Sequence, residues 1–427
     1  MRNKLDARHD FIRRFGTPEN WKLITLGEVA DVIGGGTPSR DEGRFWQNGA
    51  IPWVTPTDLT ANQSKYISSS ADSITEAGLV SSATFLLPAG AVLYTSRATI
   101  GAKAIAQIPI ATNQGFASFV PREIDGEYLY YLLEFLTPVI KRLAAGTTFD
   151  EVSKRDIRTV HCSIPTLAVE QSAIARILDA VDRATDRARE AEGSIAALRR
   201  ALMQELLPPW AGVKRVYFDR VKTDVECVEL TSAVCDVSNG STPSRTEGRY
   251  WRNGHIPWLP TRKVHDRIIT NANEFVTESA LRECSIRLLP RGSVLVGMIG
   301  QGRTRGMAAY LDIEACINQN FGAFVPREKV VGKWLFHYFD YHYNRLREIG
   351  GGTNQGAMNC FLLKRLRLPL PSIERQREVA GVLDAVEELI RAYRSVRSHY
   401  ETLKKSLMHD LLTGTVRVTD CELNPPP

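Results

Sequence analysis

The sequence predicts an α+β protein in which two similar mixed α/β domains stand in tandem, each followed by a long α-helix. Three observations predict this fold: an internal repeat with a period of 205 residues, short apolar runs separated by turn residues in each copy, and a proline-free amphipathic stretch that ends each copy. Because the repeat relates the two long helices to each other, we expect them to form an antiparallel coiled coil with pseudo-twofold symmetry.

The repeat is clearest in segments 36–53 and 241–258, which share 13 identical residues in 18 positions without a gap. The same offset relates 113–114 to 318–319, and 119–123 to 324–328. A period of this length is too long for a solenoid and indicates a duplicated domain with its connector. Two similar sites are the expected consequence, and the alternative is a duplication that serves stability alone.

The repeat divides the chain into six segments. They are an N-terminal lead (1–20), a first domain (21–165), a central long helix (166–212), a second domain (213–370), a distal long helix (371–415) and a C-terminal tail (416–427). In the first domain, runs bounded by Pro, Gly and Asn predict strands at 23–32, 86–95, 104–110 and 116–120. Apolar residues at helical spacing predict a helix at 127–144, and the second domain repeats this order.

Residues 170–207 and 374–412 contain no proline and almost no glycine, and their apolar residues recur in steps of four and three. This spacing predicts coiled-coil helices, the first about 57 Å long at 1.5 Å per residue. A rod of this length cannot bury its seam alone, so we expect the two to pair; the alternative is that each packs only on its own domain. The residues predicted to pair the helices and dock partners are Leu178, Val181, Ile195, Leu202, Leu383, Val386, Ile390 and Leu407.

Composition and motifs exclude several classes of protein. The net charge of +6 is compatible with a polyanionic partner but only weakly indicates one. The seven cysteines form no Cys-x-x-Cys motif, which favours reduced structural thiols in a cytosolic protein. The sequence shows no signal-peptide h-region and no apolar run long enough to span a membrane.

The sequence also lacks the motifs of common active sites. It contains no Walker A loop, no dinucleotide-binding glycine motif after a strand, and no Gly-x-Ser-x-Gly elbow. Its eight histidines are scattered rather than paired at metal-ligand spacing. A recognition or scaffold protein is therefore expected rather than an enzyme.

Several motifs resemble those of a known family. Trp21, Leu26-Gly27-Glu28, Gly35-Gly36-Thr37-Pro38-Ser39 and Ile51-Pro52-Trp53 resemble the start of a target recognition domain. Such domains form the specificity (S) subunit of type I restriction-modification systems. Later segments resemble the same domain and its long helices, so the resemblance spans essentially the whole chain, twice over.

The resemblance implies a subunit without catalytic activity, in the cytoplasm, that binds no cofactor or metal itself. Each target recognition domain would read one half of a bipartite, asymmetric site in double-stranded DNA, and the helices would set the spacer and dock two methyltransferase (M) subunits. The M subunits would use S-adenosylmethionine, and restriction (R) subunits would use ATP and Mg²⁺. Two alternatives stay open: a coiled-coil adaptor that reads no DNA, and a specificity subunit that serves methylation without a restriction partner.

Arginine and lysine side chains are the candidate DNA contacts, because they neutralise phosphates and can read guanine edges. The two domains differ where 260–263 replaces 56–59 and where 300–306 replaces 96–101, so we expect them to read different sequences. Trp53 and Trp258 lie in segments shared by both domains and are expected in the core. The predicted DNA-binding residues are Arg40, Arg44, Arg97, Lys103, Arg245, Arg249, Arg262, Lys263, Arg303 and Arg305.

Overall fold

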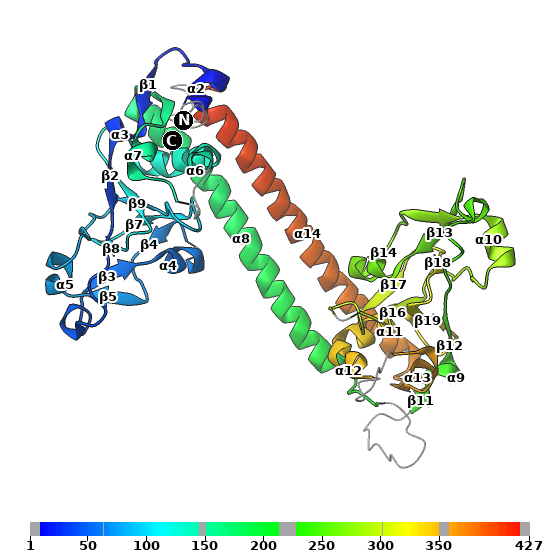
Figure 1. The fold of residues 1–427 in the computed structure, drawn as a ribbon. Helices are drawn as coiled ribbons and strands as arrows, with labels where there is room; N and C mark the ends of the chain where they lie inside the picture. Colours follow the sequence, from blue (N-terminus) through cyan, green and yellow to red (C-terminus); the bar gives the residue numbers. More distant parts are fainter. Residues whose placement is uncertain are drawn as a thin grey trace, which may run out of the picture. The chain divides into compact units, whose positions relative to one another are not determined.

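The computed structural model describes residues 9–62, 64–144, 151–212, 228–300, 302–349 and 358–418. The chain forms two compact units, whose elements are labelled in Figure 1. Unit 1 joins Met1–Ala188 to Val396–Pro427, and unit 2 comprises Arg189–Ser395. Each unit therefore contains one globular head, residues 21–165 in unit 1 and 228–370 in unit 2, with one half of each long helix.

The head of unit 1 is built from three small sheets. Its five-stranded sheet has the order β2-β9-β6-β7-β4, in which β4 pairs with β7 in parallel and the other pairs are antiparallel. A three-stranded sheet has the order β5-β3-β8, and β1 pairs with β10 antiparallel. The strands are β1 (Trp21–Thr25), β2 (Ala30–Gly34), β3 (Ile51–Val54), β4 (Tyr66–Ile67), β5 (Asp72–Ile74), β6 (Val92–Tyr94), β7 (Lys103–Ala106), β8 (Ala111–Thr112), β9 (Ala117–Pro121) and β10 (His161–Pro165).

The head of unit 2 repeats this topology strand for strand. Its sheets have the orders β12-β19-β16-β17-β14, β15-β13-β18 and β11-β20. The sequence repeat is thus also a repeat of fold. The strands are β11 (Val228–Leu230), β12 (Cys235–Asn239), β13 (Ile256–Leu259), β14 (Ile268–Ile269), β15 (Glu274–Val276), β16 (Val294–Gly297), β17 (Ala308–Leu311), β18 (Cys316–Ile317), β19 (Phe321–Pro326) and β20 (Arg367–Pro369).

Short helices precede or connect these strands. In unit 1 they are α2 (Asp10–Phe15), α3 (Leu26–Val29), η1 (Gly43–Phe45), α4 (Pro56–Ala61), α5 (Glu76–Val80) and α7 (Lys154–Arg158). In unit 2 they are α9 (Thr231–Val234), η2 (Gly248–Tyr250), η3 (Thr261–Asp266), α10 (Glu278–Glu283), α12 (Tyr343–Glu348) and α13 (Cys360–Lys364).

Three predicted strands are wrong in detail. β6 covers only Val92–Tyr94 of the run 86–95, β7 ends at Ala106 rather than at 110, and the run 23–32 is interrupted by α3. The Glu28 carboxylate accepts hydrogen bonds from both the backbone N–H and the hydroxyl of Thr25, and this local bonding begins a helical turn. The turn separates β1 from β2 and allows the two strands to join different sheets.

A buried helix lies between the sheet and the long helices in each head. Helix α6 (Gly126–Leu143) coincides closely with the predicted helix 127–144, and α11 (Gly332–Tyr341) is its counterpart in unit 2. Asp125 caps α6 by accepting a hydrogen bond from the N–H of Tyr128. The apolar side of α6 belongs to the same buried cluster as the start of α8 and the end of α14, so it joins the head to the helices.

The two long helices extend over Ala168–Leu206 (α8) and Ile373–Leu412 (α14), and each end lies within two residues of the predicted rods 170–207 and 374–412. In unit 1, Asp182 of α8 pairs with Lys404 of α14. In unit 2, Glu192, ten residues later on α8, pairs with Arg394, ten residues earlier on α14. This register is antiparallel, as predicted.

The predicted seam is buried to different degrees along the helices. Leu178, Val181, Leu383, Val386 and Ile390 are all buried. Ile195, Leu202 and Leu407 are only partly buried. The seam therefore packs most tightly where each helix begins, beside its own head, as expected if the head covers part of the apolar stripe.

No helix among the described residues is long and apolar enough to cross a membrane. Five of the seven cysteines are described, and all five are free thiols: Cys162, Cys235, Cys284, Cys316 and Cys360. Burial raises the pKa of Cys235 and that of Cys316 to about 12, so both remain protonated and unreactive at neutral pH. The other two, Cys227 and Cys421, lie outside the described residues.

Candidate nucleic-acid interface

Two variable loops follow equivalent strands, residues 96–101 after β6 and residues 298–306 after β16. In unit 1, the Ser96 N–H donates to the Gly115 carbonyl at 2.9 Å, and the Gly36 N–H donates to the Thr112 carbonyl at 3.0 Å. The first variable loop therefore lies beside two segments that the repeat shares, 34–39 and 113–115. In unit 2, the Met298 N–H donates to the Asn320 carbonyl, so the second variable loop lies beside the equivalent shared segment in the same way.

Glycine is required where these segments meet. A Cβ atom at Gly35 would lie 2.0 Å from the Thr112 carbonyl oxygen, and one at Gly240 would lie 1.8 Å from that of Ile317. Only a residue without a side chain permits this approach, so the shared glycines shape the loop edge of each head.

The shared Trp and Arg residues form matching clusters in the two heads. Trp53 and Trp258 are buried, as predicted, and their ring N–H groups donate to the carbonyls of Gly36 and Ser241. The Arg40 guanidinium lies 3.7 Å from the ring centre of Trp46 and donates to Asp72 at 2.7 Å.

Arg245 repeats this arrangement, 3.7 Å from the ring centre of Trp251 and bonded to Glu274 at 2.6 Å. The side chains of Arg40 and Arg245 are about half exposed. Each arginine therefore holds its tryptophan and its carboxylate partner together, and each still has an exposed positive charge that a partner could contact.

Four further candidates are exposed but lie near carboxylates. The N–O distances are 3.1 Å for Arg44 to Glu42, 3.9 Å for Arg97 to Glu151, 2.8 Å for Arg249 to Glu283 and 3.3 Å for Arg262 to Glu274. Exposed pairs of this kind are weak, so DNA phosphates could compete for these arginines. Their predicted DNA contacts remain predictions.

The two candidate lysines are largely buried and paired. The Lys103 side chain is 8% exposed, and its ammonium donates to Glu134 at 2.8 Å. Burial lowers its pKa, against the opposing charge of Glu134. The Lys263 side chain is 11% exposed; its ammonium pairs with Asp266 and donates to Asn271. Burial and these bonds make both lysines less accessible than the candidate arginines, and their predicted DNA contact stays a prediction. Sequence reasoning had no means of seeing that both ammonium groups are held by neighbouring side chains.

Arg303 and Arg305 differ from the other candidates, because no ion pair with a carboxylate is recorded for either within the described part of the chain. Arg303 is exposed and Arg305 partly buried, and the Nε atom of Arg305 is buried without a hydrogen-bond partner among the described residues. Gly300 and Gly306 flank them with φ values of +124° and +83°.

The backbone of the second variable loop is held from α12. The Tyr343 hydroxyl donates to the Arg303 carbonyl at 3.0 Å, and the Arg347 guanidinium donates to the Gly302 carbonyl. Tyr343 and Arg347 thus hold the loop backbone at Gly302 and Arg303, beside two arginines that form no carboxylate ion pair with the described residues.

Sequence reasoning assigned no role to a second feature of the loop edge. The Thr37 hydroxyl donates to Gln114, and the Thr242 hydroxyl donates to Gln319 at 2.7 Å. Both glutamines are exposed, whereas the preceding Asn113 and Asn318 accept backbone N–H bonds within their turns. The matching Thr–Gln bonds place an identical polar group beside each variable loop.

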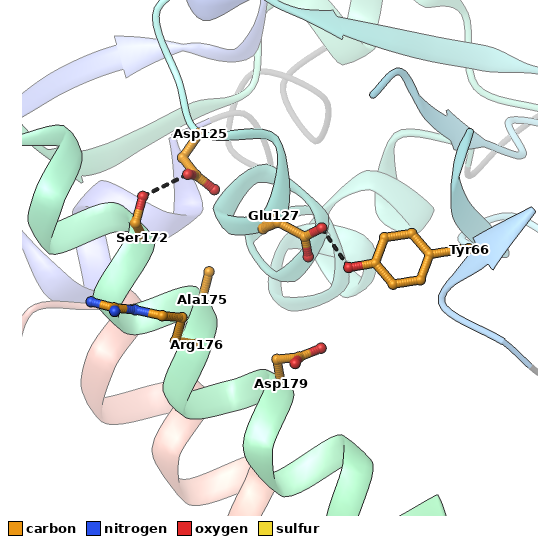
Figure 2. Close-up of a pocket in the computed structure, with 7 residues that line it drawn as sticks. All are labelled: Tyr66, Asp125, Glu127, Ser172, Ala175, Arg176 and Asp179. Carbon is orange, nitrogen blue, oxygen red and sulfur yellow. Dashed lines mark hydrogen bonds between the residues drawn. The ribbon is translucent and has the colours of Figure 1, made fainter. Parts of the chain in front are cut away.

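A hollow of about 340 Å³ lies elsewhere in unit 1, between α6, β4 and α8 (Figure 2). Its lining residues are Tyr66, Asp125, Glu127, Ser172, Ala175, Arg176 and Asp179. Three carboxylates against one guanidinium make it a poor site for a phosphate. Among the described residues, no group of three or more His, Cys, Asp or Glu side chains is placed to hold a metal ion.

The two heads, their loop edges and the long helices define a tandem recognition protein with two similar but non-identical sites. A family model for the type I restriction modification DNA specificity domain matches residues 18–192 and again 223–394. Because these matches cover most of the chain, the chain belongs to this family of type I restriction-modification specificity subunits, as the sequence motifs predicted.

Relatives and solved structures agree with this assignment. The chain is 28% identical to the type I restriction enzyme EcoprrI specificity subunit of Escherichia coli over 401 residues, 89% of this chain and 90% of that one. It is also 28% identical to the MjaIX specificity subunit of Methanocaldococcus jannaschii over 293 residues, 66% of this chain and 67% of that one. The fold is similar to the crystal structure of an S subunit from M. genitalium, with a TM-score of 0.60, 13% identity and coverage of 94% of this chain and 97% of that one.

Proposed function

We propose that this chain is the non-catalytic, DNA-reading subunit of a type I restriction-modification complex, and that each unit reads one half of a bipartite site in double-stranded DNA. The observation that carries the proposal is the repetition of one topology around two different variable loops. Shared segments position both heads in the same way, while different loops give each its own target. An asymmetric split site is the expected result.

The long helices supply the remaining functions in this proposal. A continuous helix of 39 or 40 residues is a stiff element, so it would fix the separation of the half-sites. Its exposed apolar residues, including Leu198, Leu389 and Leu403, would dock two M subunits. In the cytoplasmic complex, S-adenosylmethionine would be bound by the M subunits, and ATP with Mg²⁺ by R subunits, with no cofactor held by this chain.

A methylation map tests the proposal. Cells that express this chain with its neighbouring methyltransferase are compared with cells that lack the chain. We expect a split adenine-methylated motif with a fixed spacer, present only with the chain. An unchanged map from a complex shown to be assembled would contradict the proposal and favour the adaptor that reads no DNA. A motif that is methylated but never cleaved would indicate a complex that works without a restriction partner.

A further inference from the structure

A cluster of four charged residues ties the head of unit 1 to both long helices. Glu134 of α6 lies between Lys103 of β7 and Lys404 of α14, with N–O distances of 2.8 and 3.0 Å. Lys404 also contacts Asp182 of α8 at 2.9 Å. We call this cluster the unit 1 junction. All four side chains are at most about one-third exposed, so water screens them only partly.

A corresponding cluster occurs in unit 2. Asp340 of α11 contacts Arg267 and Arg199, each at an N–O distance of 2.6 Å. Both arginines also contact Glu387 of α14, Arg199 at 2.6 Å and Arg267 at 3.3 Å. We call this cluster the unit 2 junction. It joins the head, through Arg267 and Asp340, to α8 and α14.

The helix residues of the two junctions are related by the repeat. Asp182 and Glu387 are 205 residues apart, and so are Arg199 and Lys404. In unit 1 the acid is on α8 and the base on α14, whereas in unit 2 the acid is on α14 and the base on α8. Both units therefore build the same charged contact from equivalent helix positions.

The head residues of the junctions are not at equivalent positions. Arg267 lies in the turn between η3 and β14, whereas Lys103 begins β7, and the offset of 205 pairs Glu134 with Phe339 rather than with Asp340. Each head reaches the helix charges through its own side chains. The junctions therefore connect two different reading surfaces to a common support.

A second carboxylate extends each junction by one helical turn. In unit 1, Asp179 contacts Lys65 at 3.1 Å, and Figure 2 shows Asp179 beside Glu127 and Tyr66 at the hollow between head and helix. At the equivalent position in unit 2, Asp384 lies 2.9 Å from His337 of the buried α11. The charged contact thus continues along the helix face instead of ending at a single pair.

Charged bonds constrain orientation in a way that apolar packing does not. The apolar core stabilises each head on the helices, but hydrophobic burial has no preferred direction. Charge-assisted hydrogen bonds are short and directional. Burial raises the pKa of Asp340, but its bonds to Arg267 and the charge of Arg199 outweigh burial, and the net pKa is lowered. The carboxylate therefore stays ionised and bonded at neutral pH.

We infer that the two junctions fix the angle at which each head leaves the helices, and that they thereby restrict the spacer the protein accepts. This inference rests on the proposed function, since a spacer exists only for a protein that reads two half-sites. The junction residues are positioning residues: they touch no base, and their effect reaches DNA through the orientation of the heads.

Substitution of the helix bases tests the inference. Lys404→Met and Arg199→Met each remove one cation, but the central carboxylate keeps a second cation, Lys103 or Arg267. Neither variant leaves that carboxylate unpaired, so both should fold. Lys405→Met and Arg200→Met are matched controls, because these neighbours are exposed and are themselves related by the repeat.

The measurement is the methylation map of each assembled complex, scored for half-site sequence and spacer length separately. We expect both junction variants to keep the two half-site sequences. Methylation of sites whose spacer differs by one base pair should rise about tenfold, which corresponds to a loss of about 1.4 kcal/mol of discrimination against those sites. The control variants and the charge-preserving Lys404→Arg and Arg199→Lys should retain the parent spacer.

The outcomes separate the inference from the function beneath it. A parent complex without a split motif would contradict the proposed function itself. If the parent complex methylates a split motif and both junction variants keep the parent spacer distribution, only the inference is overturned. The inference is also overturned if the variants change the half-site sequences but keep the spacer. Should a methionine variant fail to co-purify with the methyltransferase, Lys404→Gln and Arg199→Gln, which keep a polar end in place, are judged by the same criterion.

Discussion

At the scale of single residues, side chains that look alike in the sequence differ in what they contact. Arg40 and Arg245 stack on tryptophan and pair with a carboxylate, whereas Lys103 and Lys263 point inward. Arg303 and Arg305 lack a recorded carboxylate partner in the described ranges, so their charge is the most available to DNA. Residue type predicted ten candidate DNA contacts, and the burial and ion pairs of each side chain rank them by accessibility.

The first prediction concerns these two arginines. Arg303→Ala combined with Arg305→Ala should abolish recognition of one half-site, because each lost base or phosphate contact costs about 1–3 kcal/mol. Methylation mapping and DNA binding by the assembled complex measure the effect. Arg291→Ala is a control, since that exposed arginine of the same head is paired with Asp312. Unchanged target choice would refute the role of this loop.

The second prediction concerns Asp340. Its pKa in the folded protein is below the ordinary aspartate value of about 3.9, so its stabilising contribution is present above that value and is lost as the pH falls through the lower folded pKa. Asp340→Asn should therefore lower the free energy of unfolding by about 3–5 kcal/mol at neutral pH. The difference from the parent chain should shrink in acid below pH of about 4.

Denaturant titrations of parent and variant at several pH values provide this measurement. Asp236→Asn is the matched comparison, because Asp236 pairs with Arg327 on the surface and should matter much less. A constant difference between the Asp340→Asn variant and the parent chain at all pH values would show that the carboxylate does not act through its charge.

At the scale of secondary-structure elements, local hydrogen bonds between side chains and backbone determined where strands begin and end, in addition to the apolar pattern. The run 23–32 has the composition of one strand, yet the bonds between Thr25 and Glu28 divide it into β1, α3 and β2. The long helices were predicted within a few residues, since proline-free repeats of alternating steps have few competing structures. Patterns that extend over many turns are therefore more reliable guides than short apolar runs.

The third prediction concerns a glycine inside α8. Gly193 is exposed, and a Cβ atom built on it would meet no atom within 4 Å. Gly193→Ala should raise the free energy of unfolding by about 1 kcal/mol, because alanine favours the helix and restricts the unfolded chain. Gly322→Ala in β19 should do the opposite, because its Cβ would lie 2.1 Å from Leu363. Destabilisation by Gly193→Ala would contradict the open surroundings of this position.

At the scale of the whole molecule, the compact units do not follow the linear order of the chain. Each unit combines a head with the start of one long helix and the end of the other, so residues 396–427 belong with the first head rather than the second. A linear reading of domain followed by helix does not convey this exchange. The exchange explains how equivalent positions 205 residues apart supply the same charge to the two junctions from different helices, with the acid on α8 in unit 1 and on α14 in unit 2.

The fourth prediction tests the helices as the spacer element. Leu206, at the end of α8, packs against the core of unit 2, so an insertion there would disturb that head. An insertion of seven residues in both helices, after Ala188 and after Ser395, preserves the seam and lengthens each helix by about 10 Å. The spacer should grow by about three base pairs with both half-sites unchanged. A methylation map with an unaltered spacer would exclude the helices as the ruler.

The sequence by itself determined the duplication, the long helices, the shared tryptophan cores and the family, because repeats, periodicity and motifs are properties of the chain in one dimension. Only the tertiary structure decided which cations are available and which are paired. Lys103 contacts Glu134, 31 residues away, and Lys404 contacts Asp182, more than 200 residues away. Such pairs depend on how distant elements pack, and the charge of a residue in sequence does not disclose its partner.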